Sequence, residues 1–282
     1  IIVRIAKMDR HAIENSPNLK VIGRTGVGCD SVDVEAATER GIPVVITPGA
    51  NTRAVAEHTV ALMFAAAKNL VEGDEGTRAG EYTKVRGLGK AFELQGKKLA
   101  VIGMGAIGRE TAKICEALGM SVMGYDPFLT REQIEAQGAE YFERFEDMLP
   151  LADFVSLHVP LLPTTKDMIA KKQLESMKRT AVRINCARGG SINEADRVEA
   201  LNNGTIAAAG LDVFCEEPPK PDNPLFSAKN LIVSPHSAAQ TREAVVNMAT
   251  MCVNGCLEVL AGKKCAHVFN PKAYEPYRCS RR

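Results

Sequence analysis

Short apolar runs rich in valine and isoleucine alternate along this chain with longer segments of helical period. The runs cover residues 19–22, 44–46, 99–102, 122–123, 154–155, 181–184, 206–209 and 231–233. A strand followed by a helix, repeated several times, needs crossover connections and favours a parallel sheet with helices on its faces. The pattern therefore predicts an α/β protein.

Glycine and polar residues indicate where several helices begin and end. Gly41 and Gly119 each follow a helical segment, and glycine tolerates the left-handed backbone that ends a helix. A further helix is expected between Asn193 and Gly204, because asparagine is a suitable N-cap residue.

Two long helical segments predict a discontinuous domain layout. Residues 51–69 carry apolar side chains on more than one face, as a helix buried between two domains does, and a second long helix begins near Thr241. We therefore expect residues 1–48 and 240–282 to form a smaller, flavodoxin-like α/β domain. A Rossmann-type, doubly wound parallel sheet would occupy the inserted residues 49–239.

Composition and charge narrow the class of ligand. Of 282 residues, 45% are hydrophobic but only 5% aromatic, so aliphatic side chains must fill the core. The formal charge is +1, which gives no general attraction to nucleic acid or to an anionic membrane, and neither is predicted as a partner. With no signal peptide and no long apolar run, a cytoplasmic protein is expected. Because residues 1–9 resemble a core strand, we expect further residues to precede them.

The eight cysteines are scattered and form no CxxC pair, which favours free thiols in a reducing compartment. Cys252 and Cys256 lie one helical turn apart, and we interpret this spacing as a shared helix face. No metal site is predicted.

The stretch "KKLAVIGMGAIGRETAKICEALG" indicates a nucleotide-binding loop. A strand leads into Gly103, Gly105 and Gly108 and then directly into a helix, whose N-terminal amides can bind a pyrophosphate. Asp126 follows the next strand, where a carboxylate can accept both ribose hydroxyls of an adenosine. A carboxylate there repels a 2′-phosphate, so NAD is favoured over NADP.

Three later strand ends carry candidate catalytic groups. They are Arg188 in "NCARGGS", Glu216 or Glu217 in "CEEPP", and His236 in "SPHSAAQT". Parallel sheets bind ligands at the carboxyl ends of their strands, which favours a site made by these residues. Taken singly, each could instead be an ordinary loop or structural residue.

The order of these motifs, with "GYDP" and the upstream "VIGRTGVGCDSVDVEAATERGIPVVITPGANTRAVAEHTVALM", resembles the D-isomer-specific 2-hydroxyacid dehydrogenase family, most closely its phosphoglycerate dehydrogenase branch. The resemblance covers nearly the whole chain and implies NAD-dependent interconversion of a D-2-hydroxy acid and its 2-keto acid. It makes residues 1–48 and 240–282 the substrate domain, and it implies a homodimer formed through the NAD-binding domain.

The resemblance also implies the catalytic roles. Arg188 would bind the substrate carboxylate and C2 oxygen, since a guanidinium group suits planar oxyanions. His236 would exchange a proton with the C2 oxygen as hydride is transferred. Glu217, the acid directly before Pro218, would stabilise the protonated form of His236.

The remaining site residues rest on the resemblance in the same way. The cofactor would contact Val27, Gly103, Gly105, Ala106, Ile107, Gly108, Asp126, Val159, Cys186, Ala187, Arg188, Asp212, His236 and Ala238. The substrate would contact Gly26, Val27, Gly28, Arg53, Arg188 and His236, and Arg4, Arg24 and Lys84 are further candidates. Arg4, Arg24, Arg53 and Lys84 lie at positions that resemble those around the phosphorylated substrate in phosphoglycerate dehydrogenases.

The fold and the catalytic residues do not choose among 2-hydroxy acids. The substrate pair 3-phosphoglycerate and 3-phosphohydroxypyruvate, which belongs to serine biosynthesis, is one reading. A glyoxylate or hydroxypyruvate reductase is another. A nucleotide-sensing protein of the corepressor type, built on the same fold, is the alternative outside the enzymes.

Overall fold

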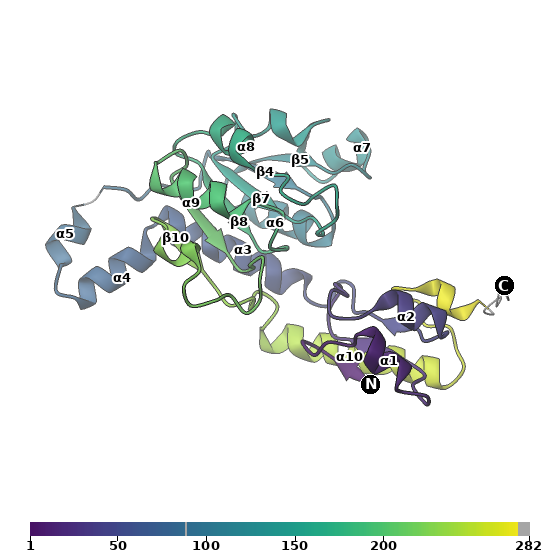
Figure 1. Cartoon of the computed structure of the whole chain (residues 1–282). Helices are drawn as coiled ribbons and strands as arrows, with labels where there is room; N and C mark the ends of the chain where they lie inside the picture. The colour runs from purple at the N-terminus through teal and green to yellow at the C-terminus, as the bar shows by residue number, and fades with distance from the viewer. Residues whose placement is uncertain (88, 276–282) are drawn as a thin grey trace. The chain divides into compact units, whose positions relative to one another are not determined.

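The computed structural model describes residues 1–87 and 89–275, which divide into two compact units (Figure 1). Unit 1 comprises residues 1–51 together with the segment that starts at Ala239, and unit 2 comprises residues 52–238. The sequence analysis placed these boundaries at 48/49 and 239/240. Of the cysteines, Cys279 lies outside the described residues.

Unit 2 is built on one sheet of seven parallel strands. Their order across the sheet is β10 (Leu231–Val233), β9 (Ala208–Leu211), β8 (Val182–Asn185), β7 (Phe154–Leu157), β4 (Lys98–Ile102), β5 (Ser121–Tyr125) and β6 (Glu140–Tyr141). From β4 the chain first winds outward to β6 and then returns to β7 on the other side of β4. The prediction of a doubly wound parallel sheet is confirmed, and the reversal between β4 and β7 creates a switch point of the kind where such folds bind ligands.

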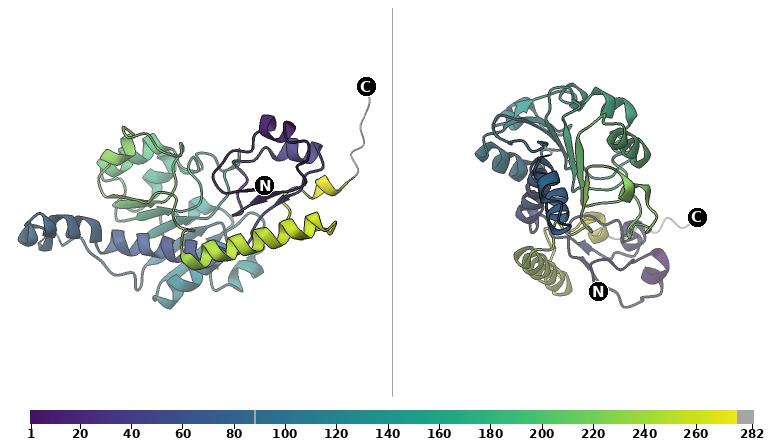
Figure 2. Two further views of the ribbon diagram at one scale, coloured as in Figure 1. Left: turned by 90° about the horizontal axis from the view of Figure 1, so that it is seen from below. Right: turned by 90° about the vertical axis from the view of Figure 1, so that its left-hand side faces the viewer.

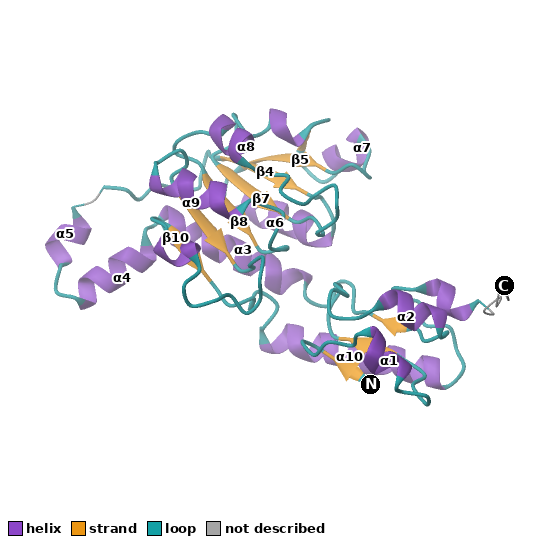
Figure 3. Cartoon of the chain, in the orientation of Figure 1, coloured by secondary structure: helices purple, strands orange, loops and turns teal. Residues whose placement is uncertain are grey.

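Helices cover both faces of this sheet, as the right-hand view of Figure 2 shows. Helix α3 (Thr52–Ala67) packs against β8, β9 and α6 (Ala106–Ala117), and α8 (Lys171–Ser176) packs against α9 (Glu194–Asn202). Strand β7 is completely buried, as a central parallel strand covered on both faces should be. Figure 3 shows the sheet enclosed by these helices.

The remaining helices of unit 2 lie at its periphery. They are α4 (Leu70–Arg78), α5 (Tyr82–Arg86) and α7 (Arg131–Glu135), with the short 3₁₀ turns η1 (Phe145–Asp147) and η2 (Pro224–Ser227). Helices α4 and α5 pack on each other and extend away from the sheet (Figures 1 and 2).

Two arginines are buried in the core of unit 2. Arg183 lies in β8 between the apolar residues Val155 of β7 and Ala209 of β9, and Arg197 lies in α9. Within the described part of the chain, Nε, Nη1 and Nη2 of Arg183 and Nε and Nη1 of Arg197 are buried with no hydrogen-bond partner. Burial first, and then the charge of Arg197, lowers the pKa of Arg183 well below its usual value.

Unit 1 contains a parallel sheet of three short strands in the order β1 (Ile2–Val3), β2 (Ile22–Arg24) and β3 (Val44–Val45). A core strand was expected over residues 1–9, and the structure forms a strand only at Ile2–Val3. Only two residues pair with β2, and Ile1 and Ile5 are exposed.

Helix α10 (Arg242–Leu260) packs on this sheet through small residues. A Cβ atom at Gly23 of β2 would lie 2.6 Å from Cys252 Sγ and 2.7 Å from Cys256 Sγ. Both sulfur atoms therefore pack against the strand at this glycine. A Cβ at Gly255 would lie 2.6 Å from Cγ1 of Val45. The Cys252–Cys256 spacing therefore marks the face of α10 that packs on the sheet.

Among the described residues, α10 is the helix that is long and apolar enough to cross a membrane by length and composition. It has 19 residues, its window has a mean hydropathy of 1.2, and 28% of that window is buried. The sequence analysis expected no such segment. Because a helix that packs on the sheet of its own unit meets the same criteria, this finding does not by itself indicate a membrane span.

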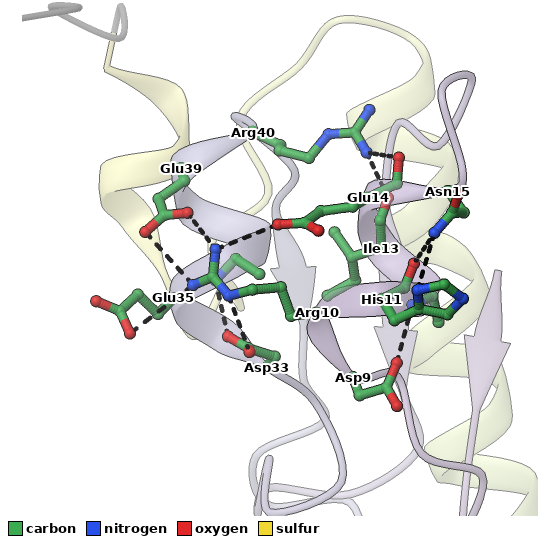
Figure 4. Close-up of polar contacts among 12 residues, drawn as sticks. Asp9, Arg10, His11, Ile13, Glu14, Asn15, Asp33, Glu35, Glu39 and Arg40 are labelled. Carbon is green, nitrogen blue, oxygen red and sulfur yellow. Dashed lines mark hydrogen bonds and ion pairs between the residues drawn. The ribbon is translucent and has the colours of Figure 1, made fainter.

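Ion pairs join the two short helices of unit 1, α1 (Arg10–Glu14) and α2 (Val34–Glu39), as Figure 4 shows. The Arg10 guanidinium lies 2.6 Å from Glu39 and 3.7 Å from Asp33. Arg40, which follows α2, donates to the backbone carbonyl oxygens of Ile13 and Glu14 at the end of α1. The 3₁₀ turn η3 (Pro271–Tyr274) also belongs to this unit.

Candidate functional site

The candidate residues of unit 2 gather at one edge of its sheet. Because all seven strands are parallel, the segments that follow them emerge along the same edge. These segments start at Gly103 after β4, Asp126 after β5, His158 after β7, Cys186 after β8, Asp212 after β9 and Ser234 after β10.

The three glycines after β4 serve different purposes. A Cβ at Gly103 would lie 2.8 Å from the carbonyl oxygen of His158, and a Cβ at Gly108 would lie 2.0 Å from the carbonyl oxygen of Gly103. Both positions therefore allow close packing of backbone on backbone. Gly105 caps the N-terminus of α6, and a Cβ there would meet no atom within 4 Å. The open space beside Gly105 suits a pyrophosphate at the N-terminus of α6, which begins with Ala106 and Ile107.

Asp126 connects the second strand of the nucleotide fold to this loop. Its Oδ2 accepts the N–H of Met104 at 2.9 Å, and its Oδ1 accepts the N–H of Phe128 at 2.9 Å. Each carboxylate oxygen keeps a second lone pair for a further donor. The carboxylate is thus held beside the glycine loop, and it retains the capacity to accept ribose hydroxyls.

The backbone around Arg188 is fixed by buried polar groups. Asn185 Nδ2 and Ser191 Oγ donate to the carbonyl oxygen of Arg188 at 2.9 and 2.8 Å. A Cβ at Gly189 would lie 1.9 Å from the carbonyl oxygen of Phe214, so only glycine fits against that segment. This loop therefore holds Arg188 beside the chain that leads to Glu217.

Glu217 and His236 form a hydrogen-bonded pair. His236 Nδ1 lies 2.6 Å from Glu217 Oε2, while Glu217 Oε1 accepts the N–H of Phe214 at 3.0 Å. Glu216, the alternative acid, is exposed and lies 3.5 Å from Lys220. The geometry therefore favours Glu217 over Glu216 as the partner of the histidine.

The pair shifts both pKa values toward the ionised forms. The hydrogen bond to Glu217 is the largest influence on His236 and raises its pKa, against burial. Burial opposes ionisation of Glu217, but hydrogen bonds from His236 and the Phe214 N–H outweigh it and lower the pKa of the carboxyl. The charge of Arg188 lowers the pKa of both groups, which supports ionisation of Glu217 and opposes protonation of His236.

Asp212 is completely buried and holds the segment that carries His236. Its Oδ1 accepts the Ser234 hydroxyl at 2.6 Å and the Ser237 N–H at 2.8 Å, and its Oδ2 accepts the Ala238 N–H at 2.9 Å. The sequence analysis predicted contact of Asp212 and Ala238 with the cofactor. The structure gives the Asp212 carboxylate a further task, which is to bind backbone amides next to the histidine.

Other predicted cofactor positions form the buried wall of this edge. Val159 is buried, and its Cγ1 lies 3.1 Å from the position of a Cβ at Gly103. Burial raises the pKa of the Cys186 thiol to about 12, so this cysteine stays protonated and does not suit a nucleophile. Ala187 follows it, with its N–H bonded to Asn185 Oδ1 at 3.0 Å.

The predicted substrate residues are divided between the units. Gly26, Val27 and Gly28 follow β2 in unit 1, where Arg4 donates to Gln240 and Arg24 to the carbonyl oxygen of Thr25. In unit 2, Arg53 pairs with Glu57 at 2.6 Å and Glu110 at 2.8 Å, and Lys84 of α5 pairs with Glu81 at 2.8 Å. Arg53 and Lys84 are thus both engaged in exposed ion pairs with carboxylates.

Sequence reasoning missed two histidines of this edge. His158 directly follows β7 and lies 2.9 Å from Ser156 Oγ, and burial lowers its pKa to about 4. Its position after a strand end, in "LHVP", was a usable signal. His58 lies within α3, where its contact with Ser234 carried no signal in the sequence.

The fold and the glycine loop define unit 2 as a dinucleotide-binding domain of the Rossmann type. The family model described as "D-isomer specific 2-hydroxyacid dehydrogenase, NAD binding domain" matches residues 60–238. The chain belongs to this family of NAD-dependent oxidoreductases.

Similar proteins agree on the family and differ in their names. The D-3-phosphoglycerate dehydrogenase of Methanocaldococcus jannaschii is 46% identical over 94% of this chain and 50% of its own length. The glyoxylate reductase of Aeropyrum pernix is 40% identical over 91% of this chain and 78% of its own length. The D-isomer specific 2-hydroxyacid dehydrogenase of Lactobacillus delbrueckii ssp. bulgaricus, solved in an NAD complexed form, has a TM-score of 0.79 at 28% identity and covers 95% of this chain and 86% of that one. The chain spans about half the length of the first two phosphoglycerate dehydrogenases that it matches.

Proposed function

We propose that this protein interconverts a D-2-hydroxy acid and its 2-keto acid with NAD(H). The observation that carries the proposal is the hydrogen-bonded pair of His236 and Glu217, held with Arg188 at the carboxyl edge of a dinucleotide-binding sheet. A proton-transfer group and a cation for the substrate are the two requirements that the chain itself must supply in such a reaction.

The pair determines which nitrogen of His236 serves the substrate. Because Nδ1 is bonded to Glu217, Nε2 remains for the C2 oxygen. In the direction of keto acid reduction, protonated His236 donates from Nε2 to that oxygen. In the reverse direction, neutral His236 accepts the hydroxyl proton. Arg188 binds the carboxylate and orients C2, since its planar guanidinium matches a carboxylate.

The residues of the glycine loop fit the cofactor of the family. The amides at the N-terminus of α6 and the open space at Gly105 would receive the pyrophosphate, and Asp126 would accept the ribose hydroxyls. NAD(H) supplies or accepts the hydride when it is bound. Val159, Cys186 and Ala187 would form the wall that excludes water from this end of the sheet.

The substrate proposal has two candidates. The name of the Methanocaldococcus jannaschii relative supports 3-phosphohydroxypyruvate, and Arg4 and Arg24 would be donors for its phosphate. The relatives named glyoxylate reductase support the second candidate, which is glyoxylate or hydroxypyruvate.

A panel of keto acids tests this proposal. NADH oxidation is followed with 3-phosphohydroxypyruvate, hydroxypyruvate, glyoxylate and pyruvate at equal concentrations. The phosphate reading predicts a kcat/KM for 3-phosphohydroxypyruvate at least about tenfold above that for hydroxypyruvate. Equal values favour the second candidate. Tight NADH binding with no turnover of any keto acid overturns the enzyme proposal and favours the nucleotide-sensing alternative.

We further propose a cytoplasmic homodimer formed through unit 2. Sedimentation in the presence of NADH tests whether the protein is a dimer.

A further inference from the structure

A chain of three polar side chains connects helix α3 to the segment that carries His236. His58 Nε2 lies 2.8 Å from Ser234 Oγ, and Ser234 Oγ lies 2.6 Å from Asp212 Oδ1. His58 Nε2 also lies 3.5 Å from Asp212 Oδ1. All three residues belong to unit 2, and they come from α3 and from the ends of β10 and β9.

Donor and acceptor rules fix the direction of these hydrogen bonds. The Ser234 hydroxyl has one hydrogen, and the Asp212 carboxylate is its nearest acceptor, because the Leu211 carbonyl oxygen lies 3.4 Å away. Ser234 Oγ must then accept from His58. The imidazole therefore carries a hydrogen on Nε2, whether it is neutral or protonated.

This series of hydrogen bonds ends at the backbone beside His236. Asp212 accepts the N–H groups of Ser237 and Ala238, the two residues that follow the histidine. His236 itself has φ 51°, a left-handed conformation that a non-glycine residue adopts only where its surroundings hold it. The Asp212 carboxylate provides this restraint, and Ser234 and His58 fix the orientation of the carboxylate.

We propose that His58 is a positioning residue for His236. Through Ser234 and Asp212, His58 holds residues 234–238 in the conformation that brings His236 to Glu217. The effect of His58 on turnover rests on the proposed function. Its effect on the pKa of His236 can be measured without turnover. The charged groups that act on His236 are Glu217, Asp212 and Arg188, and the substitutions below leave all three in place.

Proton NMR of the five histidines in the 282-residue chain tests the proposal, with His236 assigned from the His236→Gln variant. Loss of the His58 N–H loosens the segment and weakens the His236–Glu217 hydrogen bond, so the pKa of His236 should fall. We expect a decrease of about half a unit or more in His58→Leu and also in Ser234→Ala. His58→Gln, which keeps a donor at similar reach, should restore most of the shift.

Two comparisons separate positioning from a general loss of stability. His11→Leu removes an exposed histidine from α1 of unit 1 and should leave the pKa of His236 unchanged. The double variant His58→Leu/Ser234→Ala should shift that pKa no further than the single variants, because both act through one chain. An unchanged pKa of His236 in both single variants overturns the proposal, and so does a decrease that His58→Gln fails to restore.

Turnover gives an independent reading. If a 2-keto acid is reduced, His58→Leu should lower kcat about tenfold and leave the dissociation constant of NADH within about twofold. A normal kcat in His58→Leu overturns the proposal. If the wild-type chain reduces no keto acid, the dehydrogenase proposal fails, and the NMR titration still decides the role of His58.

Discussion

Glu217 Oε2 accepts a hydrogen bond from Nδ1 of His236 at 2.6 Å, and this bond is the main reason that the pKa of His236 lies above its usual value. Keto acid reduction needs the protonated histidine. Reduction should therefore be fastest at low pH and decline as the pH rises through this raised pKa, above 6.5. Glu217→Gln removes the charge and lowers the pKa, so the decline should start at lower pH. The profile of kcat/KM against pH measures this shift.

Glu216→Gln is the matched control for that experiment. Glu216 is adjacent in sequence, but its carboxylate lies 3.5 Å from Lys220. Its pH profile should coincide with that of the wild-type chain. If Glu217→Gln and Glu216→Gln give the same profile, Glu217 does not set the protonation of His236.

Alanine substitutions at two glycines of the nucleotide loop should affect different properties, which are NADH binding and stability. A Cβ at Gly105 meets no protein atom within 4 Å, whereas a Cβ at Gly108 meets a backbone oxygen at 2.0 Å. Gly105→Ala should keep its melting temperature but weaken NADH binding about tenfold, because its methyl group enters the space meant for pyrophosphate. Gly108→Ala should lose about 2 kcal/mol or more of its free energy of unfolding. Thermal unfolding and NADH fluorescence titrations measure the two effects.

The reverse result would contradict the assignment of the loop. A Gly105→Ala variant that binds NADH as tightly as the wild-type chain would show that the pyrophosphate does not lie beside this glycine.

The strand ends were the part of this site that the sequence made predictable. Alternating apolar runs located β4, β8, β9 and β10, and parallel strands bring the residues that follow them to one edge. Arg188, His236 and either Glu216 or Glu217 could therefore be predicted from the strand ends, and the family resemblance then implied Glu217. Strand β6 was missed because Glu140–Tyr141 has no apolar run.

Contacts between distant segments could not be predicted in the same way. The approach of His58 to Ser234 joins residues 176 positions apart and depends on how α3 packs on the sheet. The fully buried Arg183 was also unpredictable, because an arginine within a strand usually indicates an exposed face. Such placements follow from tertiary packing, which a local pattern does not encode.

Asp126 should determine the choice between NAD and NADP. Its carboxylate accepts two backbone N–H groups beside the glycine loop and would repel a 2′-phosphate. Asp126→Ala should weaken NADH binding by about tenfold or more and reduce the preference for NADH over NADPH. Fluorescence titrations with both nucleotides measure the ratio. An unchanged preference would show that another group reads the ribose.

Arg183 should destabilise the folded chain. Its guanidinium is buried, with no hydrogen-bond partner in the described part of the chain, and the charge of Arg197 acts on it. Arg183→Met removes the charge and keeps the length, so the free energy of unfolding should increase by about 1 to 4 kcal/mol. Urea denaturation measures it, and Arg179→Met, at an exposed position, is the matched control. A less stable Arg183→Met variant would show that the folded chain satisfies this guanidinium.

The proton transfer by His236 is the central claim, and one comparison tests it most directly. Turnover of the best keto acid and the dissociation constant of NADH are measured for the wild-type chain and for His236→Gln. We expect kcat to fall by about a thousandfold or more, because the proton donor is lost, while NADH binds with nearly unchanged affinity. A His236→Gln variant that reduces the keto acid at the wild-type rate would contradict the proposed role of His236.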